Sequence, residues 1–154
     1  MWQTLFGLTN LVALGGWLLL AFAPRRPLPL TTVLYLGVGL LCLTYAVLLG
    51  LLVGSVVDSH AVRGAGKAGF TTIAGIRAIF MSDGGVVTGW THYLAFDLFV
   101  GLWIAKDADA KGFGRLIQLP ILVATFLAGP LGLLLYLMLR ERRARALARS
   151  GSPR

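Results

Sequence analysis

The sequence predicts an all-α membrane protein: a four-transmembrane-helix bundle with a short interfacial or re-entrant helix before the third span. Two observations lead to this class. Of 154 residues, 57% are hydrophobic and 13% are charged, against roughly 25% charged residues in an ordinary soluble domain. The charges also avoid four stretches, 1–24, 27–57, 84–105 and 116–139, which together contain one charged side chain, Asp97. Each stretch supplies the roughly 17–25 apolar residues with which a helix crosses the hydrocarbon core.

The same composition excludes several other classes of protein. A disordered chain has low hydrophobicity, the reverse of this sequence, and a soluble fold would lack the polar side chains that cover its surface. The single cysteine, Cys42, excludes a disulfide scaffold. The sequence has no signature of a metal site, a phosphate-binding loop, a dinucleotide fold or a serine nucleophile, so no metal and no cofactor are expected.

The four spans are expected at about residues 5–23, 30–54, 86–104 and 116–139. A cleaved signal peptide is the alternative for the first span, but the basic residues that open such a peptide are missing, because Arg25 is the first positive charge. The loops are short, so neighbouring helices run antiparallel in a single domain, 1–139. A basic tail, 140–154, follows this domain.

The connection between the second and third spans predicts the extra helix. Its first part, Gly64–Gly69, is a flexible glycine-rich linker. In the segment 70–82, apolar residues then recur at near-helical spacing, and Ser82 begins a turn into the third span. Thirteen residues are too few to cross the bilayer, so this amphipathic segment is expected at the interface or as a re-entrant helix.

The basic residues predict an orientation. An even number of spans places both termini on the side of the 55–85 loop, and this side holds nine lysines and arginines against five on the other. The excess favours both termini in the cytoplasm. The arginine-rich tail is interpreted as an anchor to anionic membrane lipid. No nucleic-acid partner is expected, since no nucleic-acid-binding motif accompanies the tail.

The third span contains the candidate site. A carboxylate near the middle of a bilayer helix costs about 2.5–3.5 kcal/mol, so Asp97 must face a protein partner or a wet cavity. At 100° per residue, Trp90, Tyr93, Asp97 and Gly101 share one face. His92 lies beside this face, and the pair His92 and Asp97 is therefore a candidate for acid–base chemistry.

Further residues complete the predicted site. The aromatic side chains Trp90, Tyr93 and Phe96 form a stripe that would line a slot for a flat apolar ligand. Arg77 and Asp83 flank the entrance to the span, where they either close over the site or lie at the membrane surface. A structural role for Asp97, bonding a neighbouring helix to hold the bundle together, is the alternative.

These residues resemble a known family. The run Gly89–Gly101 is similar to the core motif of the abscisic-acid-deficient-4-like family, whose plant members are associated with neoxanthin synthesis. The resemblance covers nearly the whole chain. It also takes in Leu5-Phe6 through Trp17, Gly75-Ile76-Arg77-Ala78, Asp83-Gly84, Asp107, Leu119-Pro120 and Gly129–Tyr136.

The resemblance implies a cofactor-free isomerase that opens a carotenoid epoxide to an allene. Such a reaction needs an acid and a base, roles that His92 and Asp97 would fill, while Arg77 and Tyr93 would orient the oxygen. The chain lacks a plastid transit peptide and its short basic form is typical of bacteria, so a bacterial inner membrane is expected. The expected partners are membrane lipid and a carotenoid or other isoprenoid ligand. The alternative is a non-catalytic pigment-binding or accessory subunit of a larger membrane complex or homo-oligomer.

Overall fold

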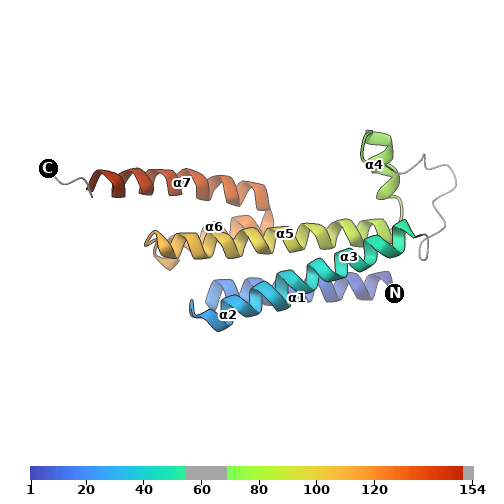
Figure 1. Cartoon of the computed structure of the whole chain (residues 1–154), viewed down its shortest axis with the longest axis horizontal. Helices are drawn as coiled ribbons and strands as arrows, with labels where there is room; N and C mark the ends of the chain where they lie inside the picture. Colours follow the sequence, from blue (N-terminus) through green and yellow to red (C-terminus); the bar gives the residue numbers. More distant parts are fainter. Residues whose placement is uncertain (55–68, 151–154) are drawn as a thin grey trace.

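The computed structural model describes residues 1–54 and 69–150, and all regular structure in them is helical (Figure 1). The predicted all-α class is confirmed for these residues. Most of the glycine-rich linker, 64–68, and the end of the basic tail, 151–154, lie outside the described residues. The helices are α1 (Trp2–Phe22), α2 (Pro27–Thr32), η1 (Val33–Gly39), α3 (Leu40–Val53), α4 (Ile73–Ile79), α5 (Asp83–Ala110), α6 (Arg115–Leu127) and α7 (Gly129–Ser150).

Two helices in the described part of the chain are long and apolar enough to cross a membrane. They are α1 and the continuous helix Pro27–Val53, which α2, η1 and α3 form together. They coincide with the first two predicted spans. Pro27 occupies the first helical position, where its missing N–H removes no helical hydrogen bond. The middle of this second helix, η1, is a seven-residue π-helical stretch.

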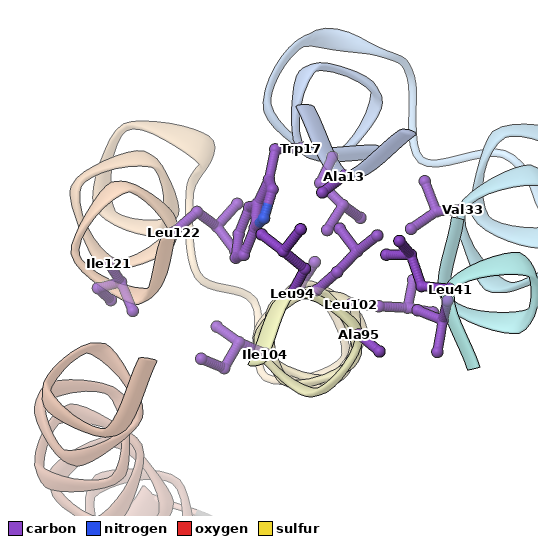
Figure 2. Close-up of a cluster of buried hydrophobic side chains, with 14 of the residues drawn as sticks. Ala13, Trp17, Val33, Leu41, Leu94, Ala95, Leu102, Ile104, Ile121 and Leu122 are labelled. Carbon is purple, nitrogen blue, oxygen red and sulfur yellow. The ribbon is translucent and has the colours of Figure 1, made fainter. Parts of the chain in front are cut away.

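The central helix is α5, which packs against α1, α3 and α6. Glycines allow the closest approaches, because a Cβ at Gly16 or Gly37 would lie 2.7 or 2.9 Å from the side chain of Leu98. The core around α5 consists of buried apolar side chains, among them Ala13, Trp17, Val33, Leu41, Leu94, Ala95, Leu102, Ile104, Ile121 and Leu122 (Figure 2). With 28 residues α5 is about 42 Å long, more than the ~30 Å hydrocarbon core.

The predicted fourth span, 116–139, is not one helix. α6 ends at Leu127, and Ala128 has φ −155° and ψ 79°, far from helical values. α7 then begins at Gly129. The break has a local cause, because in a continuing helix Pro130 would lack the N–H that bonds the Phe126 carbonyl and its ring would clash with that carbonyl. A four-span bundle is therefore not what the structure shows.

After this break the chain reverses direction. Gln118, near the start of α6, bonds Asp109 near the end of α5, so α6 runs antiparallel to α5. Gly129 then lies against Asp97, and Arg140, eleven residues later, reaches Asp107, ten residues beyond Asp97. α7 therefore runs parallel to α5, and α6 and α7 form a helical hairpin whose tip meets the middle of α5.

The hairpin determines where the two ends of the chain lie. Figure 1 shows the N-terminus at one end of the long axis and the last turns of α7 at the other. We call the end that holds residues 23–26 and 107–115 the polar end. The C-terminal part of α7 lies at the polar end and the N-terminus at the opposite end. An unbroken fourth helix, as predicted, would have placed both termini at the same end.

The short helix predicted before the third span is present as α4, Ile73–Ile79, and is shorter than the predicted segment 70–82. The Thr72 hydroxyl caps it by accepting the Gly75 N–H at 3.0 Å. The Ser82 hydroxyl caps α5 in the same way through Gly85, also at 3.0 Å. In Figure 1, α4 stands across the long axis at the end opposite the polar end, the direction expected of a helix in the plane of an interface.

Candidate functional site

Asp97 lies at the centre of the candidate site. It is in the middle of α5 and only 9% exposed. Its carboxylate faces the tip of the α6–α7 hairpin, where a Cβ on Gly129 would overlap Oδ1. The polar groups that act on this carboxylate are the hydroxyl of Tyr93 and the backbone N–H of Gly129.

The contact with Gly129 places Asp97 at the N-terminus of α7. The N–H groups of Leu131 and Gly132 donate to the Ala128 carbonyl at 2.9 and 3.1 Å, and Pro130 has no N–H to satisfy. The remaining N–H of this first turn, that of Gly129, acts on both the Asp97 carboxylate and the Tyr93 hydroxyl. A helix N-terminus carries partial positive charge, which stabilises an anionic cap.

One carboxylate oxygen remains uncommitted. Oδ2 of Asp97 is buried and has no hydrogen-bond partner among the described residues. Buried polar atoms are nearly always paired, so an exception marks a position where a ligand or a transferred proton is to be expected. Oδ1 thus contacts the tip of the hairpin, and Oδ2 has no partner among the described residues.

An aromatic row leads from Asp97 toward the N-terminal end of α1. The rings of Trp90 and Tyr93 stack with centroids 5.2 Å apart and an interplanar angle of 25°, and Phe6 lies 5.9 Å from Trp90. Trp90 Nε1 donates to Asn10 Oδ1 at 3.1 Å. The predicted face of Trp90, Tyr93 and Asp97 is therefore formed. Asn10 joins it from α1, although the sequence indicated only a polar contact there.

His92 lies on a different face of α5. Its ring is 5.2 Å from Tyr45 of α3 and 4.7 Å from Phe96, and Phe96 itself is 56% exposed. Five residues separate His92 from Asp97, which at 100° per residue places their side chains about 140° apart around the helix. The predicted acid–base pair is not brought together.

Arg77 and Asp83 lie away from Asp97. Arg77 is in the last turn of α4, Asp83 is the first residue of α5, and both side chains are exposed. The rise along α5 from Asp83 to Asp97 is about 21 Å. Of the two placements considered from sequence, a position at the end of the bundle agrees with the structure, and closure over the carboxylate does not.

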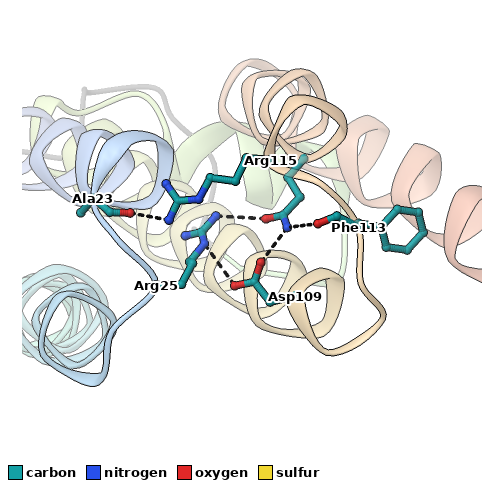
Figure 3. Close-up of polar contacts among 6 residues, drawn as sticks. Ala23, Arg25, Asp109, Phe113 and Arg115 are labelled. Carbon is teal, nitrogen blue, oxygen red and sulfur yellow. Dashed lines mark hydrogen bonds and ion pairs between the residues drawn. The ribbon is translucent and has the colours of Figure 1, made fainter.

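A second polar cluster, which sequence analysis did not single out, occupies the polar end. Gln118, only 1% exposed, donates from Nε2 to Asp109 Oδ1 at 2.7 Å and to the Phe113 carbonyl at 2.8 Å. Arg25 donates to Gln118 Oε1 at 3.2 Å and pairs with Asp109 Oδ2 at 3.3 Å. Arg115 donates to the Ala23 carbonyl at 2.6 Å. Figure 3 shows how these contacts join the α1–α2 connection to α5 and α6.

Charges at the polar end are balanced by these contacts. Burial lowers the pKa of Arg25 from its usual range, an effect that Asp109 opposes and Arg115 increases. Burial alone would raise the pKa of Asp107, but hydrogen bonds from Tyr136, Arg140 and Lys111 outweigh it and hold this pKa at about 2. Arg140 Nε is 2.8 Å from Asp107 Oδ2. These contacts fasten α7 to the end of α5.

A groove lies apart from these residues. It has a volume of about 440 Å³ and lies between the N-terminal part of α1 and the C-terminal part of α3. Its lining is Met1, Trp2, Leu5, Leu43, Thr44, Val47, Leu48 and Leu51. In the described part of the chain, no three histidine, cysteine or acidic side chains gather as metal ligands would.

Comparison with known protein families tests the family resemblance that the run Gly89–Gly101 suggested. The model of the ABA DEFICIENT 4-like family matches residues 4–136, most of the chain. The chain belongs to the ABA DEFICIENT 4-like family. The match includes Asp97, the aromatic row and the tip of the hairpin. Together with the two apolar helices, membership of the ABA DEFICIENT 4-like family indicates a membrane protein. Neither the curated proteins nor the solved structures contain a match to this chain.

Proposed function

We propose that this protein is a membrane isomerase for an apolar isoprenoid, with an epoxy-carotenoid as the substrate class, and that Asp97 transfers the proton. One observation carries the proposal: the buried Oδ2 of Asp97 has no hydrogen-bond partner among the described residues. Membership of the ABA DEFICIENT 4-like family supports the substrate class, through the neoxanthin synthesis associated with its plant members.

The chemistry needs groups that move a proton and no co-reactant. When an epoxide opens to an allenic alcohol, a C–H bond and a C–O bond break, a C=C bond forms, and the oxygen gains a proton. Asp97 Oδ2 takes the proton from carbon while the Tyr93 hydroxyl donates to the oxygen. The contact between Tyr93 and Asp97 then returns the proton to Tyr93, so both residues end in their starting states.

The aromatic row gives the substrate a place beside the carboxylate. Trp90 and Tyr93 present stacked rings next to Asp97, and flat apolar surfaces suit a conjugated chain. In this proposal His92 lies on another face of α5, beside Phe96 and Tyr45, and does not share a proton with Asp97. Arg77 and Asp83 have no part in the chemical step.

A second function, a pigment-binding or accessory subunit, is favoured by a different observation. His92, Phe96, Phe99 and Trp103 are spaced along one face of α5 and all are exposed. Exposed aromatic rings in a row are typical of a surface that binds a partner or a ligand. This function predicts a pigment or a larger membrane complex that co-purifies with the chain, with no requirement for Asp97.

The test is expression in a host that accumulates epoxy-carotenoids, followed by chromatography of the extracted pigments. The informative variant is Asp97→Asn, because an amide oxygen still accepts the Gly129 N–H while the group no longer takes a proton. The matched control is Thr44→Val, a change at a half-buried residue of α3 whose hydroxyl bonds only its own helix.

We expect the wild-type chain and Thr44→Val to give a new isomer, and Asp97→Asn to accumulate equally without giving it. Identical pigment profiles with and without the gene would overturn the enzymatic proposal. A co-purifying pigment that Asp97→Asn retains, with no new isomer, would establish the second function instead.

A further inference from the structure

The hairpin formed by α6 and α7 changes how the chain sits in a membrane. α6 has 13 residues, a length of about 20 Å, which is less than the ~30 Å hydrocarbon core. Its tip lies against Asp97, in the middle of α5, and α7 returns to the polar end. A helix that enters half-way and turns back leaves the chain on the side from which it entered.

We propose that the chain crosses the membrane three times and dips into it once, so that its termini lie on opposite sides and its arginine-rich end contacts anionic headgroups of the cytoplasmic leaflet. The three crossings are α1, the helix Pro27–Val53 and α5. The dip is the α6–α7 hairpin. This proposal replaces the orientation expected from four full spans and does not depend on the proposed catalytic role of Asp97.

The distribution of basic residues supports the direction. The part of the sequence between α3 and α5 contains only three basic residues, Arg63, Lys67 and Arg77. The polar end and α7 contribute ten basic residues up to Ser150: Arg25, Arg26, Lys106, Lys111, Arg115, Arg140, Arg142, Arg143, Arg145 and Arg149. The three-crossing topology thus has ten basic residues on one side and three on the other, whereas the four-span topology has nine and five. Because basic residues concentrate on the cytoplasmic side, the larger excess favours the polar end in the cytoplasm.

The depth of the arginines fits a lipid surface. The rise along α7 from Gly129 to Arg140 is about 16 Å, close to half of the ~30 Å core. If the tip of the hairpin lies at the bilayer midplane, Arg140 lies at the level of the lipid headgroups. Arg142 and Arg145, which are both exposed, then lie among the headgroups as well. Figure 1 shows the second half of α7 projecting past the ends of α5 and α6. Basic residues near an anionic lipid surface are attracted to it.

The topology is tested by labelling cysteines with a membrane-impermeant maleimide in intact bacterial cells. In a Cys42→Ala background, one variant carries Gln3→Cys at the start of α1 and the other carries Ser150→Cys at the end of α7. We expect Gln3→Cys to react in intact cells, and Ser150→Cys to react only after the membrane is opened.

Every other pattern overturns the topology. Equal reactivity of the two positions in intact cells would mean that the termini share a side, and reaction of Ser150→Cys alone would mean the reverse orientation. A second measurement does not depend on cysteine variants. Green fluorescent protein fused to the C-terminus should fluoresce, whereas alkaline phosphatase fused there should be inactive.

The lipid contact is tested with the full chain in vesicles of phosphatidylcholine, with or without phosphatidylglycerol. A polarity-sensitive dye on Ser150→Cys should shift to shorter emission wavelength only in the anionic vesicles, and high salt should reverse the shift. The control replaces Arg142, Arg143, Arg145 and Arg149 with glutamine and should show no shift. The same emission in neutral and anionic vesicles would overturn the contact, and a shift produced by added oligonucleotide alone would assign the arginines to nucleic acid instead.

Discussion

The carboxylate of Asp97, in the middle of α5, lies against Gly129, the first residue of α7, where a Cβ would overlap Oδ1. This contact joins the one charged residue within the predicted spans to the tip of the α6–α7 hairpin. It accounts for a buried carboxylate, because the helix N-terminus supplies a donor and partial positive charge. It also holds the tip of the α6–α7 hairpin against the central helix.

Gly129→Ala should destabilise the protein, because the new Cβ would overlap Asp97 Oδ1. We expect a loss of about 1–3 kcal/mol in the free energy of unfolding, as for other overpacked cores, measured by thermal unfolding in detergent. The matched control is Gly15→Ala, whose Cβ would meet no atom within 4 Å. That change should be neutral or raise stability by up to ~1 kcal/mol. Equal effects of the two substitutions would contradict the contact.

Asp97→Ala and Asp97→Asn should differ in stability. Alanine removes the cap of α7 and should cost about 1 kcal/mol, whereas asparagine caps helices about as well as aspartate. Thermal unfolding of the two variants under identical detergent conditions measures the difference. If asparagine destabilises as much as alanine, the negative charge and not the hydrogen bond holds the hairpin.

The bond between Trp90 Nε1 and Asn10 Oδ1 should appear in a double-mutant cycle. Asn10→Leu and Trp90→Phe each break it, and their effects on the free energy of unfolding should be coupled by about 0.5–1.5 kcal/mol. Asn10→Leu combined with Trp103→Phe is the control pair, since Trp103 contacts Tyr136 instead. Additive effects in both pairs would show that the bond contributes nothing to stability.

Acid should loosen the polar end through Asp107. Its pKa in the folded protein is about 2, below the ~3.9 of an unfolded chain. The contribution to stability is therefore complete above pH 4 and is lost as the pH falls from about 4 to 2, by about 2 kcal/mol. The variant Asp107→Asn should be less stable than the wild type at pH 6. On acidification to pH 2.5 it should lose less stability than the wild type does. Parallel pH profiles for the wild type and this variant would contradict the assignment.

The local parts of the fold could be predicted from the sequence. The two apolar helices and the short helix before α5 depend on residues close together in the chain, and the structure contains all of them. The reversal after Leu127 could not be predicted in the same way. An apolar stretch from 116 to 139 has the length of a span whether it runs straight or folds back.

The site could be predicted in part. The spacing of Trp90, Tyr93 and Asp97 along one helix determines that they share a face, and the structure places them together. His92 was paired with Asp97 because the two are near in sequence, but about 140° around the helix separates them. The contact of Gly129 with Asp97 could not be predicted, since it depends on the path of α7.

By itself, the sequence determined that this protein is all-helical and apolar and that Asp97 is its exceptional residue, because hydropathy, helical period and charge are properties of neighbouring residues. It also carried the motif that leads to the ABA DEFICIENT 4-like family. Only the tertiary structure decided which way α7 runs, what caps it and which residues surround the carboxylate. Those features follow from packing between helices far apart in the chain, where Asp97 meets Gly129 and Asp107 meets Arg140.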